Sequence, residues 1–269
     1  LGGYGEFHLE VKAHDKVDGK DFNTGDMLRY VQYVGYKFTD KLLINVELEF
    51  EHGTTSGNWA GKGGSVSVEF ASLEYLAHRM FNVRAGVLLV PVGFVNELHE
   101  PAFFHGNLRP AVETAIIPTT WRELGVGVFG ELFEGFTYKL YGLTGFDGLR
   151  FGEGGWRGGR QKGGRPIAED FAMVLSLLYD WRSIIQVGAS VYYGGADQSR
   201  VADDASSNTL LVEGRVQLRY RRFEFRALGV YGALSGAEAL TKAVYPDSAD
   251  PADPETRLIG SRLYGWYVE

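Results

Sequence analysis

The strongest constraint on the fold is an alternation of apolar and polar residues that recurs along the chain. In the segment 42–51, one face carries Leu42, Ile44, Val46, Leu48 and Phe50, and the opposite face carries Asn45, Glu47, Glu49 and Glu51. A helix would scatter these carboxylates around its circumference, whereas a strand separates them cleanly from the apolar side chains. The segment is therefore predicted to be a β-strand with one apolar and one polar face.

The same pattern predicts about twelve strands, most of them nine to eleven residues long. They cover residues 7–13, 28–38, 42–51, 66–76, 81–89, 122–130, 136–144, 171–179, 185–193, 212–220, 223–231 and 259–268. Ordinary strands average about five to six residues, whereas a tilted strand of about 9–11 residues crosses a bilayer core. Aromatic residues near the strand ends, such as Tyr36, Tyr192, Tyr193 and Trp266, are typical of interfacial girdles.

The connections alternate between short turns, such as 39–41 and 180–182, and long polar segments, such as 91–121 and 145–170. Short turns at one end and long loops at the other are the arrangement of outer-membrane barrels. We therefore predict an all-β, transmembrane, antiparallel up-and-down β-barrel that forms one domain over residues 1–269. A soluble barrel or sandwich is the alternative, but it would need an apolar interior, which the acidic strand faces do not supply.

Composition narrows the possible functions further. The chain has no cysteine, so disulfides, thiolate metal sites and cysteine nucleophiles are excluded. Its formal net charge of −7 disfavours general nucleic-acid binding. No run of 18 apolar residues predicts a transmembrane helix, and no Walker loop or Gly-x-Ser-x-Gly motif is present. We expect no enzymatic activity, no metal and no cofactor.

The segment 84–162 carries a more specific signal, above all between Pro91 and Glu123. It contains Val90-Pro91-Val92-Gly93, Asn96-Glu97-Leu98-His99-Glu100-Pro101 and Ile116-Ile117-Pro118-Thr119-Thr120-Trp121-Arg122-Glu123. Together with Gly3-Tyr4-Gly5-Glu6, these residues resemble the phosphate-selective porin O and P family of outer-membrane proteins.

That resemblance implies a barrel of about 16 strands that lies in the bacterial outer membrane, is commonly trimeric and passes small solutes by diffusion. Since about twelve strands can be counted, we expect that a C-terminal part of about four strands is missing from this sequence. A barrel of about twelve strands is the alternative.

The connection 91–120 is the third long loop, the position at which general porins fold a loop inward to narrow the pore. It combines large apolar residues with charged and ionisable ones, namely Glu97, His99, Glu100, Arg109 and Glu113, which we predict to form the constriction. A surface loop that packs on itself or on a neighbouring subunit is the alternative. The spacing of the histidines and glutamates matches no known metal motif.

Two further sets of charged residues are predicted to act on solutes. Lumen-lining charges would be Arg84, Glu47, Glu49, Arg215, Arg219 and Arg226, and an anion-attracting loop would carry Arg150, Arg157, Arg160, Lys162 and Arg165. That loop could instead bridge lipopolysaccharide phosphates or simply be solvated. Because the strand faces are mixed in charge, the sign of the ion selectivity stays open at this point.

The leading hypothesis is a porin, a water-filled channel for passive diffusion of small hydrophilic solutes or inorganic anions. The alternative is a non-conducting barrel that anchors another envelope component. Expected partners are outer-membrane lipid, lipopolysaccharide and two further copies in a homotrimer, for which glycines such as Gly125, Gly214 and Gly229 on the strand faces would allow close packing.

Overall fold

The computed structural model describes residues 1–12, 22–57, 63–106, 108–152, 154–201, 206–246 and 258–269. Contacts between Cα atoms divide the chain into two compact units, Leu1–Glu74 and Tyr75–Glu269, and each is described by itself. Ala13, the predicted end of the first strand, lies outside the described residues.

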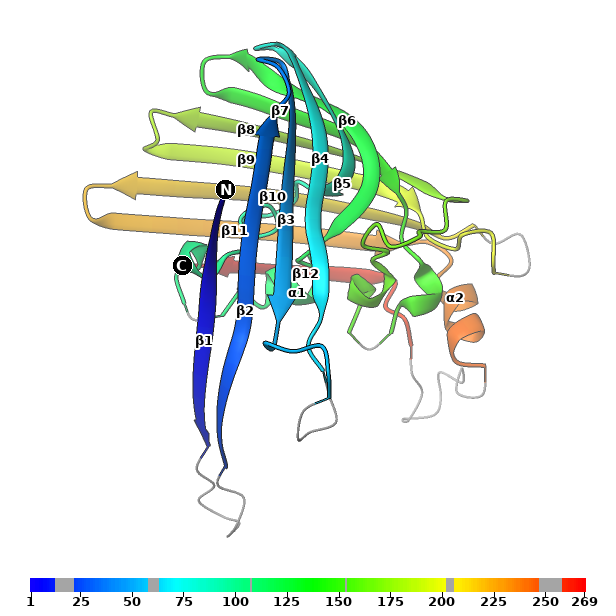
Figure 1. Ribbon diagram of the computed structural model, residues 1–269. Helices are drawn as coiled ribbons and strands as arrows, with labels where there is room; N and C mark the ends of the chain where they lie inside the picture. Colours follow the sequence, from blue (N-terminus) through cyan, green and yellow to red (C-terminus); the bar gives the residue numbers. More distant parts are fainter. Residues whose placement is uncertain (13–21, 58–62, 107, 153, 202–205, 247–257) are drawn as a thin grey trace. The chain divides into compact units, whose positions relative to one another are not determined.

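All twelve predicted strands are present, and the all-β fold class is confirmed. The first unit holds β1 (Gly2–Lys12), β2 (Phe22–Lys37), β3 (Leu42–Glu51) and most of β4 (Val66–His78). The second unit adds β5 (Phe81–Leu89), β6 (Arg122–Phe133), β7 (Phe136–Thr144), β8 (Phe171–Trp181), β9 (Ile185–Gly195), β10 (Asn208–Tyr220), β11 (Phe223–Leu234) and β12 (Arg262–Val268). Each strand neighbours the next in sequence, which is up-and-down topology (Figure 1).

Short helical segments occur only in the connections of the second unit, as far as the described residues extend. They are η1 (Pro101–Phe103), α1 (Val112–Ala115), η2 (Gly148–Arg150), η3 (Trp156–Gly159) and α2 (Ala237–Val244). None of the helices in the described ranges has the length and apolar character needed to cross a membrane.

Predicted and observed strands differ at both ends: β2, β9, β10 and β11 extend further at the loop end, and β4, β6 and β8 extend further at the turn end. β3, β5 and β7 have the predicted bounds, while most of the others extend further. The exception is β12, which begins at Arg262 and not at Ile259. The backbone N–H of Ile259 donates to Thr241 Oγ1 of α2 at 3.1 Å, and its side chain is buried there, so the chain leaves the ladder at that point.

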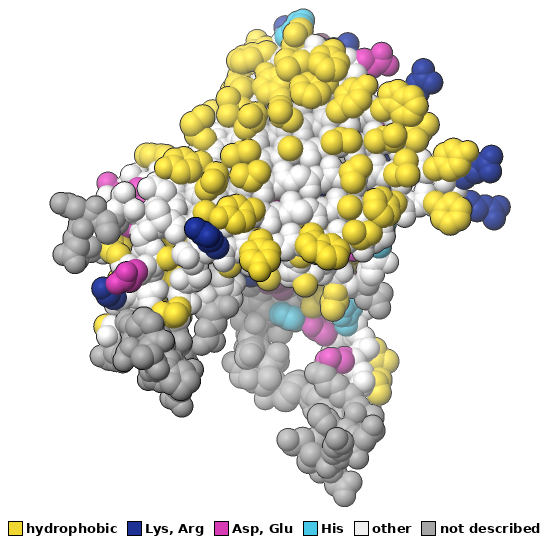
Figure 2. Space-filling model, turned by 180° about the vertical axis from the view of Figure 1, so that it is seen from behind, with side chains coloured by type: hydrophobic (Ala, Val, Ile, Leu, Met, Phe, Trp, Pro, Cys, Tyr) yellow, Lys and Arg dark blue, Asp and Glu magenta, His cyan; other side chains and the backbone are white. Residues whose placement is uncertain are grey.

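Alternation along the strands gives the second unit an apolar outer face. In β8 the side chains of Phe171, Met173 and Leu175 are exposed, while those of Ala172 and Val174 are buried on the opposite, inner face. Figure 2 shows such apolar side chains spread over the outer face of this unit. Apolar residues therefore point outward along the strand, as the sequence predicted for a chain that meets lipid.

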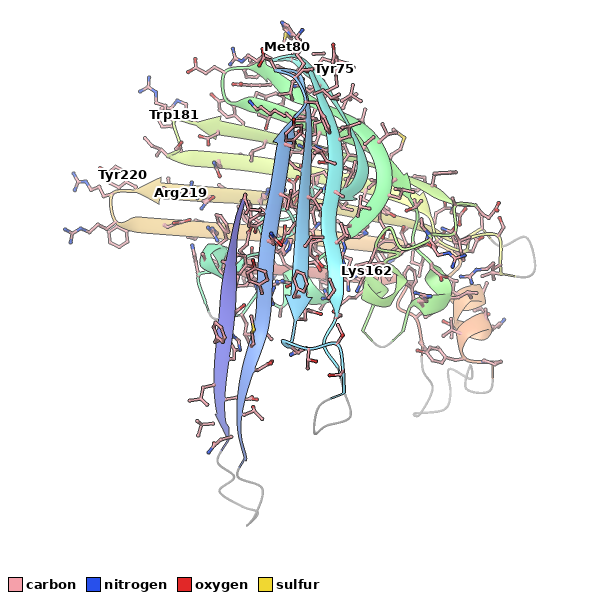
Figure 3. All side chains as sticks on the ribbon, in the orientation of Figure 1. Tyr75, Met80, Lys162, Trp181, Arg219 and Tyr220 are labelled. Atoms are coloured by element: carbon pink, nitrogen blue, oxygen red, sulfur yellow. The ribbon has the colours of Figure 1, made fainter. Side chains whose placement is uncertain are left out.

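Aromatic residues mark the turn ends of these strands. Trp181 and Tyr220 are exposed where β8 and β10 reach their short turns (Figure 3). Near the opposite end of β9, Tyr193 is likewise exposed, as predicted for the girdles. Trp266 is also exposed, but it pairs with Gly229 in the middle of β11 and does not mark an end of the sheet.

The loop end of the inner face differs from the prediction, because it is apolar. Trp121 stacks on Phe146 at 4.7 Å between ring centroids and contacts Tyr192 at 4.6 Å. Phe151 and Trp156 complete this aromatic cluster, and each of the five side chains is at most 2% exposed. Tyr192, predicted to belong to a girdle, is thus an interior residue, because the connections after β5 and β7 bring their own apolar side chains onto the inner face.

The first unit has a polar buried face. Glu47 and Glu49 of β3 and Glu69 of β4 are each at most 5% exposed. Arg29 of β2 forms ion pairs with Glu49 and with Glu6 of β1, both at 2.9 Å. The acidic face predicted from the segment 42–51 is therefore buried and partly neutralised within its own unit.

The outer face can be tested at Val191, an exposed residue of β9 that pairs with the exposed Leu175 and Val212 on its two sides. We expect Val191→Arg to lower the free energy of unfolding in lipid vesicles by about 2–4 kcal/mol, because a charge would replace a lipid contact. Urea unfolding measures this, with Val191→Leu as the apolar control. Equal stability of the two variants would contradict a lipid-facing position.

Candidate functional site

The connection between β5 and β6 folds onto the inner face of the second unit. Ser190 of β9 donates a hydrogen bond to the carbonyl of Pro91 at 2.9 Å, and Arg226 of β11 donates to the carbonyl of Phe103 at 2.8 Å. Strands that follow the loop by about a hundred residues therefore hold both its beginning and its middle. We call residues 90–121 the inner loop.

Asn96 closes the base of the inner loop. Its Nδ2 donates to the carbonyls of Val90 and Trp121 at 2.7 and 2.8 Å, and its Oδ1 accepts from the Trp121 N–H at 2.6 Å. Asn96 is wholly buried, so its amide satisfies backbone groups that water cannot reach. One side chain thus joins the two ends of a loop of about thirty residues.

A buried carboxylate, Glu113 of α1, joins the inner loop to β12. It accepts from the Val95 N–H at 2.8 Å and from the Tyr267 hydroxyl at 2.5 Å. Gly93 has a φ of +77°, and a Cβ there would lie 2.3 Å from Glu113 Oε2, so only glycine fits. Burial raises the pKa of Glu113 to about 7, although these hydrogen bonds act in the opposite direction.

A cavity of about 570 Å³ lies between the inner loop and the inner face. Its cationic side chains are Arg84 of β5, Lys139 of β7, Arg215 and Arg219 of β10, and Arg226 of β11. Glu97 is the carboxylate among its lining residues, and Gln186 and Gln217 add amides. Phe94, Val95, Leu98, Phe103 and Leu178 supply its apolar surface.

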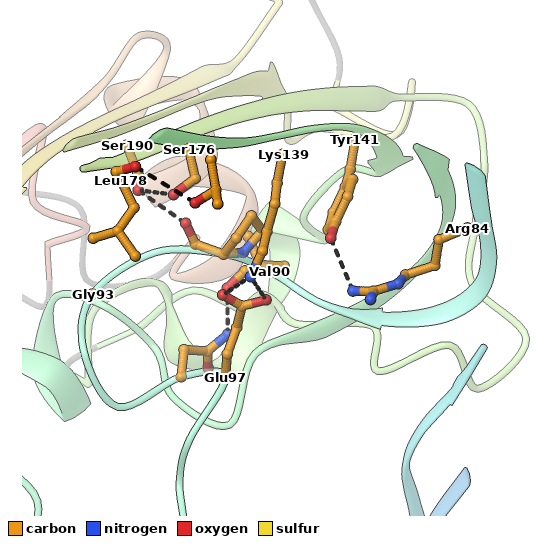
Figure 4. Close-up of polar contacts among 12 residues, drawn as sticks. Arg84, Val90, Gly93, Glu97, Lys139, Tyr141, Ser176, Leu178 and Ser190 are labelled. Atoms are coloured by element: carbon orange, nitrogen blue, oxygen red, sulfur yellow. Dashed lines mark hydrogen bonds and ion pairs between the residues drawn. The ribbon is translucent and has the colours of Figure 1, made fainter. Parts of the chain in front are cut away.

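Most of these cations have partners that fix their positions. Lys139 Nζ contacts both oxygens of Glu97 at 2.6 and 2.7 Å, and this pair crosses from the strand to the loop (Figure 4). Arg84 donates to the Tyr141 hydroxyl at 3.0 Å (Figure 4) and lies 4.4 Å above the ring of Phe129. The cavity wall is therefore ordered by contacts of the protein with itself.

Further ion pairs hold the arginines of β10 and β11. Arg215 pairs with the buried Glu213 at 2.6 Å. Arg226 and Arg219 share Glu224, at 3.0 and 3.4 Å. Since positions 215, 217 and 219 alternate along β10, their side chains share the inner face of that strand.

The predicted constriction residues have different locations within the inner loop. Glu97 lines the cavity, whereas His99 is buried with its ring Nδ1 3.2 Å from the Asn96 carbonyl oxygen. Arg109 donates to the His99 carbonyl at 3.4 Å, and Glu113 is the buried link to β12. Glu100 is partly buried just before η1.

Four of the predicted lumen charges, Arg84, Arg215, Arg219 and Arg226, meet in the cavity. The other two, Glu47 and Glu49, belong to the first unit. Sequence analysis missed Lys139, Gln186 and Gln217. The alternation of the segment 136–144 could have identified Lys139, because it places this residue on the same face as Tyr141 and opposite to Tyr138 and Leu140.

The arginine-rich connection between β7 and β8 does not present its predicted cations together. Arg160 is buried and donates to the carbonyls of Pro118 and Thr120 at 3.0 Å, which ties this connection to the inner loop. Arg150 is exposed and contacts Asp147 at 3.3 Å, and Lys162 and Arg165 are exposed. Arg157 is partly buried, and this burial lowers its pKa.

Within the described ranges, no three histidine, aspartate or glutamate side chains are grouped so that they could hold a metal ion. His105 lies 3.5 Å from Glu224 and 3.4 Å from Glu269.

Comparison with known proteins supports the fold. The chain is 31% identical over 277 residues to an uncharacterized protein of Aquifex aeolicus (strain VF5), an alignment that covers all of this chain and 60% of that protein. The chain therefore spans less than two thirds of the curated relative that it matches. No family model matches this chain.

Among solved structures, OmpF of Salmonella typhi in complex with daunomycin superposes with a TM-score of 0.53 at 12% identity, over 98% of this chain and 71% of that one. A loop-deletion mutant of OmpT from Vibrio cholerae gives a TM-score of 0.39 at 10% identity, over 86% and 82%, which is too slight to support an argument. The likeness to OmpF shows that this chain has the fold of an outer-membrane porin β-barrel.

The role of Asn96 can be measured directly. We expect Asn96→Ala to lower the free energy of unfolding in detergent micelles by about 2–3 kcal/mol, because it removes three buried hydrogen bonds and leaves the Trp121 N–H without its acceptor. Thr114→Ala, which removes an exposed hydroxyl of the same loop, is the control and should change stability by less than about 0.5 kcal/mol. Equal effects would show that the base of the inner loop does not depend on Asn96.

Glu113 should make stability depend on pH. Its pKa is raised from 4.5 to about 7 in the folded state, so its contribution is fully present below pH 4.5 and is lost as pH rises toward 7. The loss is on the order of 3 kcal/mol. Glu113→Gln mimics the neutral carboxyl and should flatten the curve of unfolding free energy against pH between these values. Parallel curves for the two proteins would contradict the raised pKa.

Proposed function

We propose that the protein lies in the bacterial outer membrane and forms a water-filled channel for small hydrophilic solutes, with a preference for anions. The observation that carries this proposal is the cavity between the inner loop and the inner face, with its five cations against one lining carboxylate. An apolar outer face and the fold of a porin barrel support it further.

Charge near the cavity favours anions even though the whole chain is acidic. Glu97 lines the cavity and Glu213 and Glu224 form ion pairs with its arginines, so five lining cations meet three carboxylates in these direct contacts. Charges set ion preference through the local field, and contributions beyond about 8–10 Å are strongly screened. The cations that line the cavity therefore affect ion preference there more than distant acidic residues do.

Finer properties of the channel belong to the same proposal. Inorganic phosphate is one candidate solute, on the resemblance of segment 84–162 to phosphate-selective porins. The exposed Arg150, Lys162 and Arg165 would attract anions or lipopolysaccharide phosphates at the loop end. A homotrimer is supported by outward glycines such as Gly214 and Gly229, beside which a Cβ would meet open space.

One observation favours a second candidate, a non-conducting barrel whose interior is blocked and which anchors another envelope component. The aromatic cluster of Trp121, Phe146, Phe151, Trp156 and Tyr192 fills the loop end of the inner face in the second unit. If this cluster closed the whole interior, no ions would pass.

Conductance of the natural full-length protein in a planar bilayer under a KCl gradient distinguishes the two candidates. Discrete current steps would support a channel, and the reversal potential would give the sign of its selectivity. Correctly folded protein that gives no steps would overturn the channel and favour the anchor.

Removing either charge of the ion pair between Lys139 and Glu97 should shift the ion selectivity in opposite directions. We expect Glu97→Gln to shift the reversal potential toward stronger anion preference, because it removes a negative charge and releases Lys139. Lys139→Met should shift it toward cations. Glu238→Gln, which makes the same charge change on the exposed face of α2, is the control. Shifts of one sign in both cavity variants would contradict the proposed role.

A further inference from the structure

The cavity has two chemically different sides. The strand wall carries the guanidinium groups of Arg215, Arg219 and Arg226, and the inner loop contributes the apolar side chains of Leu98 and Phe103. We propose that it is a binding site for a small organic anion in which a carboxylate is attached to an aromatic or branched apolar group. This inference rests on the proposed channel and names the class of solute that it selects.

Hydrogen-bond donors outnumber acceptors on the cationic side. Arg226, Arg219 and Gln217 all point donors at a single oxygen, Glu224 Oε1, with Arg226 at 3.0 Å and Arg219 at 3.4 Å. His105 lies 3.5 Å from the same atom. A carboxylate oxygen cannot accept well from so many donors at once, and a contact of 3.4 Å is weak. A solute carboxylate would supply the missing acceptors.

Arg219 has the best access to such a solute. Its side chain is 45% exposed, and in the described part of the chain it makes the single long contact with Glu224. It contacts the same oxygen of Glu224 as Arg226 does, so a carboxylate bound beside them would accept from two guanidinium groups. Hydrogen bonds that arginine donates to a carboxylate are charge-assisted and among the stronger ones in proteins.

The other two guanidinium groups are already oriented. Arg215 and Arg226 lie 5.9 and 5.7 Å from the centre of the Phe94 ring, which places this loop residue against both. Gly188 on β9 makes room for Arg215, because a Cβ there would lie 2.9 Å from its Nε. Fixed donors lose little conformational entropy when a ligand binds.

The apolar side explains why the ligand is organic. The side chains of Leu98 and Phe103 are 49% and 43% exposed, although they belong to a loop that folds inward. An inorganic anion would leave them in water, whereas an aromatic or branched group would cover them and gain from that burial. A volume of about 570 Å³ is ample for such a molecule.

Calorimetric titration of the natural full-length protein in detergent micelles tests the proposal independently of conductance. The probes are benzoate, acetate, inorganic phosphate and benzyl alcohol. We expect benzoate to bind at least about tenfold more tightly than acetate or phosphate, because only benzoate engages both sides of the cavity. Benzyl alcohol, which has the aromatic ring but lacks the negative charge, should bind more weakly than benzoate. Equal binding of benzoate and acetate, or tighter binding of phosphate, would overturn the inference.

Two variants locate the binding site. Arg219→Gln should weaken benzoate and acetate alike by about tenfold, because both lose a charge-assisted hydrogen bond. Phe103→Ala should weaken benzoate by about three- to tenfold and leave acetate unchanged. Arg222→Gln, at the exposed turn between β10 and β11, makes the same charge change outside the cavity and should bind benzoate normally. If both cavity variants bind benzoate like Arg222→Gln, the site is elsewhere.

The two proposals can fail separately. A conducting channel that does not distinguish benzoate from acetate would leave the channel standing and end this inference. A silent barrel that binds benzoate with the expected dependence on Arg219 and Phe103 would end the channel proposal and keep the site.

Discussion

The attachment of the inner loop to the inner face is the interaction on which the rest of the site depends. A chain segment folded inside a barrel must satisfy its backbone N–H and C=O groups without a sheet partner. Asn96 does so at the base of the loop, and Ser190, Arg226 and Glu113 do so along it. Without these contacts one wall of the cavity would be missing, and the arginines of β10 and β11 would face open water.

How much of this could be predicted depends on whether the signal is local. Alternation along each strand revealed the twelve strands and placed Arg84, Arg215, Arg219 and Arg226 on one face, because a strand fixes the direction of its own side chains. Where a long loop packs depends on contacts with residues that are distant in the sequence, so no local pattern predicts it. Arg160 resembled a free cation in the sequence, yet it is buried against the carbonyls of Pro118 and Thr120.

The aromatic cluster was missed for the same reason. Trp121 directly precedes β6, Phe146 lies two residues after β7, and Trp156 lies in a glycine-rich connection, so no periodicity links them. They meet because two connections fold onto the same inner face. Glycine permits this approach at Gly232, where a Cβ would lie 2.8 Å from the Trp156 ring. The polar interior expected from β3 thus holds for the turn end of the second unit and fails at its loop end.

This division of the interior also sets the size of the cavity. Trp121 belongs both to the aromatic cluster and, through its backbone, to the base of the inner loop at Asn96. The aromatic cluster is close-packed and resists compression, so it keeps the base of the inner loop from moving closer to the inner face. On the opposite side the ion pair of Lys139 with Glu97 prevents the loop from moving away. The aromatic cluster and the ion pair together fix the distance between the inner loop and the inner face. The space that remains between them is the cavity in which a solute would contact the arginines.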